Sequence, residues 1–157
     1  MTDSPVLIVF CREPVAGQTK TRLIEKLGAK NAAALADAFI IDTMAKASAL
    51  EPSKLVIAGT GGDAVQQNRY FRLLARRFGA QLMDQGQGSL GARMAHAIAP
   101  FCDKGALLIG TDLPSLPFAA LRRLSDLLVR RKLVLGPSLD GGYYAIGVRG
   151  DLPPVFT

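Results

Sequence analysis

Asp112 is the residue around which the possible chemistry of this sequence is organised. It follows an apolar run, Leu107 to Ile109, that is typical of a strand buried on both faces. In open α/β sheets, ligands bind beyond the carboxyl ends of such strands. Because Pro114 fixes its own φ and favours an extended Leu113, the loop should hold the carboxylate in one direction. The expected target is a metal ion that carries a phosphate; the alternative is that Asp112 only begins a turn or caps the next helix.

A basic loop between the first expected strand and a short helix is the second candidate. Gly17 permits close approach of the backbone to a ligand, and Lys20 and Arg22, on either side of Thr21, can neutralise a polyphosphate. The spacings of a Walker A loop and of a dinucleotide-binding G-x-G-x-x-G are both absent. The loop therefore predicts phosphate binding of another type, or a solvated helix start with Thr21 as its cap.

Two more loops carry weaker signals. Gly88, Leu90, Gly91 and Arg93 lie in a glycine-rich strand-to-helix junction, where an ordinary loop with Arg93 in solvent is the alternative to ligand contact. Asp140 opens an Asp-Gly-Gly segment that by itself predicts a hairpin turn. Since it follows the strand after Asp112, the two carboxylates could converge at one sheet edge and bind Mg²⁺.

The elements that must position these loops alternate along the chain. Strands are expected at Val6–Phe10, Lys54–Ala58, Ala80–Met83, Leu107–Ile109, Leu133–Leu135 and Tyr143–Val148. Helices are expected at Asn31–Leu50 with Asp37, Asp42 and Lys46 facing water, from a cap at Asp63 to Phe78 with Gly79 as the stop, at about Ala92–Ala99, and along the stripe Leu121, Leu124 and Leu128. This order predicts one α/β domain over residues 1–157, with three α/β/α layers, a mainly parallel sheet and a late antiparallel element at the Asp-Gly-Gly turn.

Composition narrows the class of protein. With 49% hydrophobic and 20% charged residues, the chain should fold as an ordinary globular domain. Its net charge of +6 is not gathered in a basic run with interleaved aromatics, which favours phosphorylated small molecules over nucleic acid. No apolar stretch suits a signal core or membrane insertion, so the cytoplasm is the expected location. Cys11 and Cys102 lack metal-ligand spacing and are expected to be reduced.

Three motifs carry a resemblance to a known family. F-x-x-x-P-x-x-G-x-x-K-T-R-L, G-T-D-L-P-x-L and P-S-x-D-G-G-Y-Y occur in this order between Phe10 and Gly147. They resemble a bacterial family of GT-A-like proteins described as glycosyltransferases, within the nucleotide-diphospho-sugar transferase superfamily. That family is similar to the guanylyltransferases that make molybdenum-cofactor dinucleotide and activate phospholactate.

The resemblance implies a GT-A fold and a role for each loop. It places Gly17, Lys20 and Arg22 in the nucleotide-phosphate loop, Asp112 at the metal, Asp140 at a second metal or acceptor position, and the segment 88–93 near the base or ribose. The implied cofactor is Mg²⁺, with Mn²⁺ as the alternative, and the implied partners are a nucleotide or nucleotide-sugar and a small-molecule acceptor. Family members usually continue past the point where this sequence stops, so elements on the acceptor side are expected to be missing.

Three functions follow as hypotheses. The leading one is a metal-dependent transferase that moves a sugar from a nucleoside diphosphate-sugar to a small acceptor. Asp112, Lys20 and Asp140 would then be catalytic, the first two by stabilising the departing diphosphate. The alternatives are a nucleotidyltransferase that joins a nucleoside triphosphate to a phosphorylated acceptor, and a nucleotide-binding module without catalysis. The sequence leaves open the base, the sugar, the acceptor and the oligomeric state.

Overall fold

The computed structural model describes residues 4–156 as a mixed α/β fold built on one six-stranded sheet. The strands are β1 (Val6–Cys11), β2 (Lys54–Gly59), β3 (Gln81–Asp84), β4 (Ala106–Ile109), β5 (Leu133–Pro137) and β6 (Tyr143–Val148). The α-helices are α1 (Thr21–Leu27), α2 (Ala29–Ala49), α3 (Arg69–Phe78), α4 (Leu90–Ile98) and α5 (Phe118–Leu128). Short 3-10 helices are η1 (Gly62–Gln66), η2 (Ala99–Lys104) and η3 (Pro154–Phe156).

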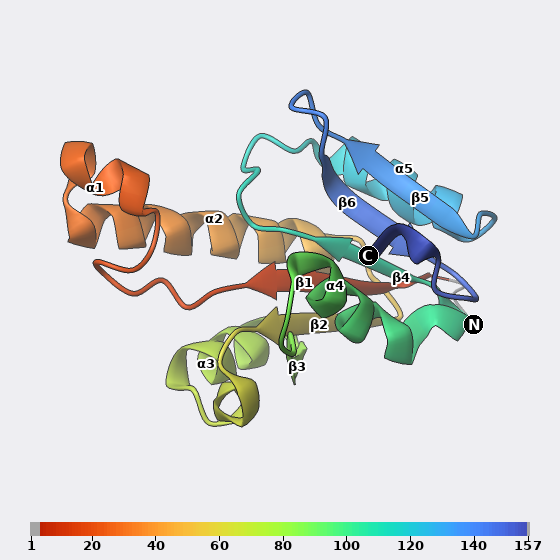
Figure 1. Ribbon diagram of the computed structural model, residues 1–157, viewed down its shortest axis with the longest axis horizontal. Helices are drawn as coiled ribbons and strands as arrows, with labels where there is room; N and C mark the ends of the chain where they lie inside the picture. Colours follow the sequence, from red (N-terminus) through yellow and green to blue (C-terminus); the bar gives the residue numbers. More distant parts are fainter. Residues whose placement is uncertain (1–3, 157) are drawn as a thin grey trace.

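The strand order is β3-β2-β1-β4-β6-β5 (Figure 1). β1 lies parallel to both β2 and β4, and β2 lies parallel to β3. β6 pairs antiparallel with β4 on one side and with β5 on the other. The expected mainly parallel sheet with a late antiparallel element is therefore confirmed.

Helices cover both faces of the sheet, as the apolar central strands require. One face packs against α2, α3 and α5, with the fully buried Phe71 among its contacts. The other packs against α4, η2 and η3, and α4 lies in front of the sheet in Figure 1 while α2 passes behind it. The three-layer arrangement predicted from the sequence is present. Within residues 4–156, no helix combines the length and apolar character needed to span a membrane.

The boundaries of two helices differ from expectation. Asp63 does not cap a helix that runs to Phe78; it lies in η1, and α3 begins only after Asn68, whose side chain accepts a hydrogen bond from the Phe71 N–H. Asn68 is the stronger cap because its carbonyl oxygen satisfies a free helix-start donor. By the same reasoning, α4 starts at Leu90 rather than Ala92, since the Ser89 hydroxyl accepts from the Ala92 N–H.

Two polar residues of α2 that were expected to face water have partners instead. Asp37 accepts a hydrogen bond of 2.7 Å from the Tyr70 hydroxyl, and burial together with this bond raises the pKa of Tyr70. Lys46 donates to two backbone carbonyls of the loop after β4. Asp42 is exposed, as predicted. Helical periodicity alone misplaced Asp37 and Lys46 because both partners come from distant parts of the chain.

Candidate nucleotide-binding cavity

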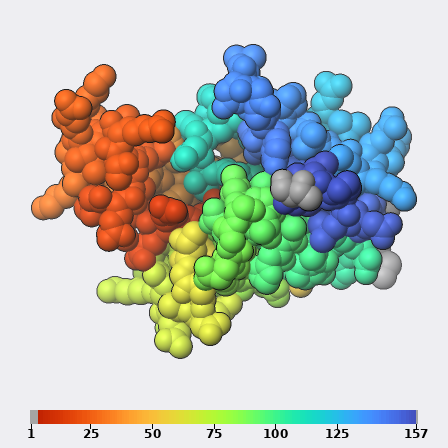
Figure 2. Space-filling view, in the orientation of Figure 1, coloured from red at the N-terminus to blue at the C-terminus, as the bar shows by residue number. Residues whose placement is uncertain are grey.

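A cavity of about 490 Å³ opens where the parallel strands end. Its lining includes the residues that directly follow these strands, namely Arg12 after β1, Thr60 after β2, Gln85 after β3 and Gly110–Asp112 after β4. In the space-filling view, a hollow lies between the red-orange N-terminal segment, the green α4 and the cyan loop after β4 (Figure 2). This is the edge at which open α/β sheets bind ligands.

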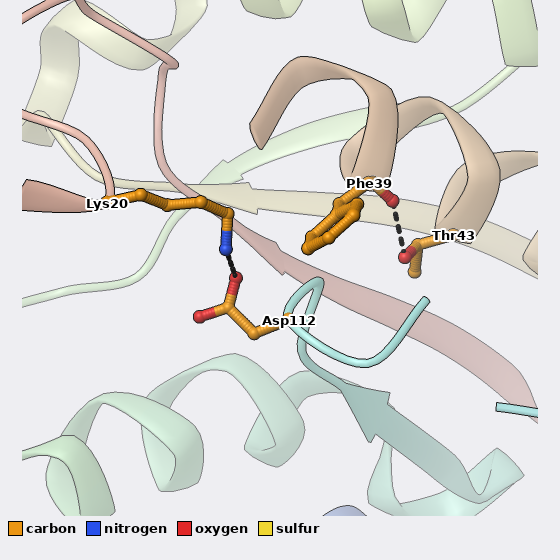
Figure 3. Close-up of polar contacts among 4 residues, drawn as sticks. All are labelled: Lys20, Phe39, Thr43 and Asp112. Carbon is orange, nitrogen blue, oxygen red and sulfur yellow. Dashed lines mark hydrogen bonds and ion pairs between the residues drawn. The ribbon is translucent and has the colours of Figure 1, made fainter. Parts of the chain in front are cut away.

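Lys20 and Asp112 meet in this cavity although 92 positions separate them in the sequence. The Lys20 Nζ lies 3.0 Å from the Asp112 Oδ1, in the one ion pair found among the described residues. The same ammonium lies 4.6 Å from the centroid of the Phe39 ring on α2 (Figure 3). The Asp112 side chain is 86% exposed and that of Lys20 only 15%. The carboxylate is thus open to a ligand while the ammonium is fixed beside it.

The loop that carries Lys20 is anchored at its start. Glu13 accepts a 2.7 Å hydrogen bond from the Asn68 amide, and its backbone carbonyl accepts one of 3.4 Å from the Thr19 hydroxyl. Lys20 itself has left-handed backbone angles, φ 48° and ψ 48°. This backbone conformation is unfavourable for residues other than glycine, and such strain concentrates at functional sites.

The loop that carries Asp112 is held from behind by α2. The Lys46 Nζ donates to the carbonyl oxygens of Pro114 at 2.7 Å and Leu116 at 3.0 Å. Together with the buried strand before it, this clamp fixes where the carboxylate emerges. Lys46 is a positioning residue that sequence reasoning missed, because no local motif marks it.

Gln85 and Arg93 form a second polar group in the cavity. The Gln85 side chain is buried, with 4% of its surface exposed, and its Nε2 donates to the carbonyls of Ala58 at 2.9 Å and Cys11 at 3.4 Å. Its Oε1 accepts a 2.9 Å bond from the Arg93 Nη1. Arg93, a residue predicted from the sequence, lines the cavity, whereas no sequence motif points to Gln85.

The cavity is cationic overall. Among the described residues, its lining contains the side chains of Arg12, Lys20 and Arg93 and a single carboxylate, that of Asp112. Such a balance suits a polyanionic ligand. Cys11 also lines the cavity, and burial, followed by the charge of Asp37, raises its pKa to about 12. Its thiol therefore stays protonated at neutral pH, which does not suit a nucleophile.

The other predicted nucleotide contacts are arranged less directly. Thr21 and Arg22 are exposed on α1 and do not line the cavity, and neither does Gly17, which has a φ of 85° in the loop before it. Leu90 does line it, whereas Gly88 and Gly91 do not. At Gly91 a Cβ atom would lie 2.4 Å from the Phe156 carbonyl oxygen, so this glycine is required for packing of η3 on α4.

Asp140 lies in the turn between β5 and β6. Its Oδ1 accepts hydrogen bonds from the Ser138 hydroxyl and from the Gly142 N–H, and these bonds lower the pKa of the carboxyl. The pairing of Ile109 with Ala145 brings this turn to the same sheet edge as Asp112. Asp140 does not line the 490 Å³ cavity, so the structure brings the two carboxylates to one edge without joining them in one cavity.

A second cavity, of about 360 Å³, adjoins the first on the side of β6. The two share Phe10, Leu90 and Gly110 in their linings. The second cavity is lined mainly by apolar and aromatic side chains, including those of Tyr143 and Met94. A ligand in the first cavity can therefore extend toward the β5–β6 turn.

The donors present fit a divalent ion that is shared with a ligand. Among residues 4–156, no group of three or more His, Cys, Asp or Glu side chains could hold a metal. Mg²⁺ commonly binds through one or two carboxylates together with substrate phosphates and water, rather than in a protein cage. Asp112, exposed in a cationic cavity, matches this second type of site.

Comparison with known proteins decides the family. The sequence pattern of a family described as "Uncharacterized protein conserved in bacteria (DUF2064)" matches residues 40–157. The chain belongs to the DUF2064 family. A search of curated proteins gave no significant match.

Solved structures place this DUF2064 protein among nucleotide-dependent transferases by fold. A protein from Desulfovibrio desulfuricans G20 that is assigned as a nucleotide-diphospho-sugar transferase is 30% identical to this chain. The two structures match with a TM-score of 0.85 over 99% of this chain and 68% of that one. The 4-diphosphocytidyl-2C-methyl-D-erythritol synthase of Anaerococcus prevotii is 7% identical, with a TM-score of 0.56 over 94% and 70%. The glucosyl-3-phosphoglycerate synthase of Mycobacterium tuberculosis, solved with Mn²⁺ and UDP, is 12% identical, with a TM-score of 0.50 over 81% and 40%.

These neighbours confirm the GT-A-like α/β fold expected for the DUF2064 protein. The expected enzyme class, a transferase, is supported by the 30% identical Desulfovibrio desulfuricans protein, which is assigned as a nucleotide-diphospho-sugar transferase. The suggested relation to guanylyltransferases, and the role of each site residue, stay predictions.

Proposed function

We propose that this DUF2064 protein is a metal-dependent transferase that binds a nucleoside diphosphate-sugar and moves the sugar to a small acceptor. The observation that carries the proposal is the Lys20–Asp112 pair in a cationic cavity at the ends of the parallel strands. The 30% identical protein of the same fold, assigned as a nucleotide-diphospho-sugar transferase, supports it.

The side chains take complementary roles in this reaction. Asp112 would hold the divalent ion, which offsets negative charge on the diphosphate. Lys20 would stabilise the charge that develops as the bond from the anomeric carbon to the diphosphate breaks. Arg22, which is exposed on α1, would assist by reaching the ligand from outside the cavity. An acceptor oxygen forms the new bond to that carbon, and its proton passes to a base, for which Asp140 is the candidate at the acceptor side.

A nucleotidyltransferase is the second candidate, favoured by the fold shared with the Anaerococcus prevotii synthase and by the Lys-Thr-Arg loop. In that reaction a phosphate oxygen of the acceptor attacks the α-phosphorus of a nucleoside triphosphate, and pyrophosphate leaves. The same Lys20 and Asp112 would stabilise the departing group. Product analysis therefore has to separate the two functions.

Thermal unfolding with nucleotides provides the first test. We expect one of UDP, GDP, ADP or CDP to raise the melting temperature by about 5 °C or more at saturation with Mg²⁺ or Mn²⁺, because only ligands that prefer the native state stabilise it. Each metal alone should change it little, since Asp112 is expected to need ligand oxygens to complete the site. Failure of every nucleotide to shift melting would contradict the proposal.

Products of incubation with a mixture of small-molecule acceptors then identify the reaction. Release of nucleoside diphosphate from a nucleotide-sugar supports sugar transfer, and release of pyrophosphate from a triphosphate supports nucleotidyl transfer. Tight binding with neither product would identify a nucleotide-binding module.

Asp140→Asn tests the proposed second carboxylate. The Asn carbonyl can still accept the bonds from Ser138 and Gly142, and Asn-Gly forms the same turn, so the melting temperature should stay unchanged. If Asp140 serves the metal or the acceptor, turnover should fall about tenfold or more because the charge is lost. Full turnover with normal melting would leave Asp140 as a turn residue only.

A further inference from the structure

We propose that Gln85 is a positioning residue that fixes Arg93 as a donor for the nucleotide base, and that Arg93 favours bases with two neighbouring hydrogen-bond acceptors. The inference rests on the proposed function, because it assumes that the cavity holds a nucleotide. The family resemblance already placed the segment 88–93 near the base or ribose; the inference adds which bases Arg93 favours and a positioning role for Gln85 that no motif indicated.

The orientation of the Gln85 amide follows from its surroundings. Two backbone carbonyls, of Ala58 and Cys11, face one end of the amide, and carbonyls only accept hydrogen bonds. The NH₂ group must therefore point toward them, and the amide oxygen must point toward Arg93. Since Gln85 is almost fully buried, this orientation has little freedom to change.

Arg93 is held by this oxygen and keeps donors for a ligand. Its Nη1 is bonded to Gln85, and its Nε is enclosed with no hydrogen-bond partner among the described residues. No carboxylate in the described part of the chain forms an ion pair with it. The hydrogens of Nη2 and the second hydrogen of Nη1 have no acceptor within residues 4–156, so the planar guanidinium keeps neighbouring donors for a ligand.

The position of this pair in the sheet favours the base over the phosphates. The Gln85 amide lies over the ends of β2 and β1, whereas Asp112 follows β4, on the other side of β1. A nucleotide whose diphosphate lies at Lys20 and Asp112 then extends its base toward Gln85 and Arg93. Guanine offers the neighbouring acceptors N7 and O6, and cytosine offers O2 and N3, whereas adenine places a donor beside each ring acceptor on its N6 side.

Binding measurements with Arg93→Gln test the base contact. In the parent protein, GDP or CDP should bind more tightly than ADP in the presence of Mg²⁺. Arg93→Gln should weaken binding of the preferred nucleotide about tenfold or more, while binding of inorganic pyrophosphate with Mg²⁺ stays unchanged. Arg72→Gln, on the exposed side of α3, is the matched control and should change neither. The base assignment would be overturned if the parent protein bound ADP most tightly, or if Arg93→Gln weakened binding of pyrophosphate as much as binding of the nucleotide.

NMR of the arginine Nε–H group tests Gln85 without any nucleotide. The enclosed Arg93 Nε–H should give a resolved signal, identified by its loss in Arg93→Gln, with a ¹H–¹⁵N heteronuclear NOE typical of the folded backbone. Arg72, which has no hydrogen-bond or ion-pair partner in the described part of the chain, should give a low value. In Gln85→Met the Arg93 value should fall to that of Arg72. A mobile Arg93 in the parent would already overturn the positioning role, so the test holds even if Gln85→Met fails to fold.

A double-mutant cycle separates positioning from general stability. If Gln85 acts through Arg93, Gln85→Met should weaken nucleotide binding in the parent but add nothing in the Arg93→Gln background. Equal effects in both backgrounds would contradict the proposal. If no nucleotide binds the parent protein, the proposed function and the base contact both fail, and the NMR measurement still decides whether Gln85 holds Arg93.

Discussion

Asp112→Asn should reduce metal-dependent nucleotide binding by about 100-fold or more, because even residues that only support a metal ligand cost 10- to 100-fold on removal. The substitution takes away one charge and leaves the volume almost unchanged. The amide oxygen can still accept from Lys20, and an exposed ion pair contributes only about 0–1 kcal/mol to folding. Calorimetry with the nucleotide that stabilises the parent, with and without Mg²⁺, measures the effect.

A matched control comes from α5. Asp126 is also exposed and lies outside the cavity, so Asp126→Asn changes the net charge equally without touching the site. It should bind the nucleotide and metal as the parent does. Equal Mg²⁺-dependent binding in Asp112→Asn and the parent would remove Asp112 from the metal site.

Lys20→Ala should change binding of nucleotide and of metal in opposite directions. A charge-assisted contact contributes about 1.5–3 kcal/mol, so affinity for a nucleoside diphosphate should fall about tenfold or more, with a smaller loss for the monophosphate. In the structure, however, the ammonium lies on the Asp112 Oδ1, where a divalent ion would compete with it. Removing Lys20 should therefore strengthen binding of Mn²⁺ alone.

Titration of Mn²⁺ by electron paramagnetic resonance, without nucleotide, isolates the second effect. Lys26→Ala provides the control, since Lys26 is exposed on α1 and does not line the cavity. A Lys20→Ala protein with weaker Mn²⁺ binding would show that the ion does not compete at Asp112. Unchanged affinity for the diphosphate would leave Lys20 as a helix-start residue.

The sheet could be predicted because its signals are local. Val6 to Val9 and Leu107 to Ile109 are apolar runs that only a strand covered on both faces would bury, and the structure buries all of them. The hairpin could be predicted as well, because Asp-Gly-Gly favours a tight turn through the backbone preferences of its own residues.

What could not be predicted depends on contacts between distant residues. The loops with Lys20 and Asp112 were each recognised as candidates, but their direct pairing arises only when β1 and β4 become neighbours. Lys46 and Gln85 carry no motif, since each acts by bonding backbone carbonyls whose positions depend on the whole fold. The exposure of Arg22 could not be predicted either, because in the sequence Arg22 is only two residues from Lys20, which does line the cavity.

The two cavities are lined by different parts of the chain, and this division affects how such proteins can change during evolution. Every residue that lines the 490 Å³ cavity lies between Phe10 and Asp112, whereas half of those lining its neighbour lie between Gly142 and Ile146. The β5–β6 hairpin joins the rest of the sheet along a single edge, that of β4. Mutations in the hairpin can therefore accumulate without altering a residue of the first cavity. If the proposed function is right, exchange of the hairpin between related genes would change the acceptor side of the site and leave the lining of the first cavity as it was.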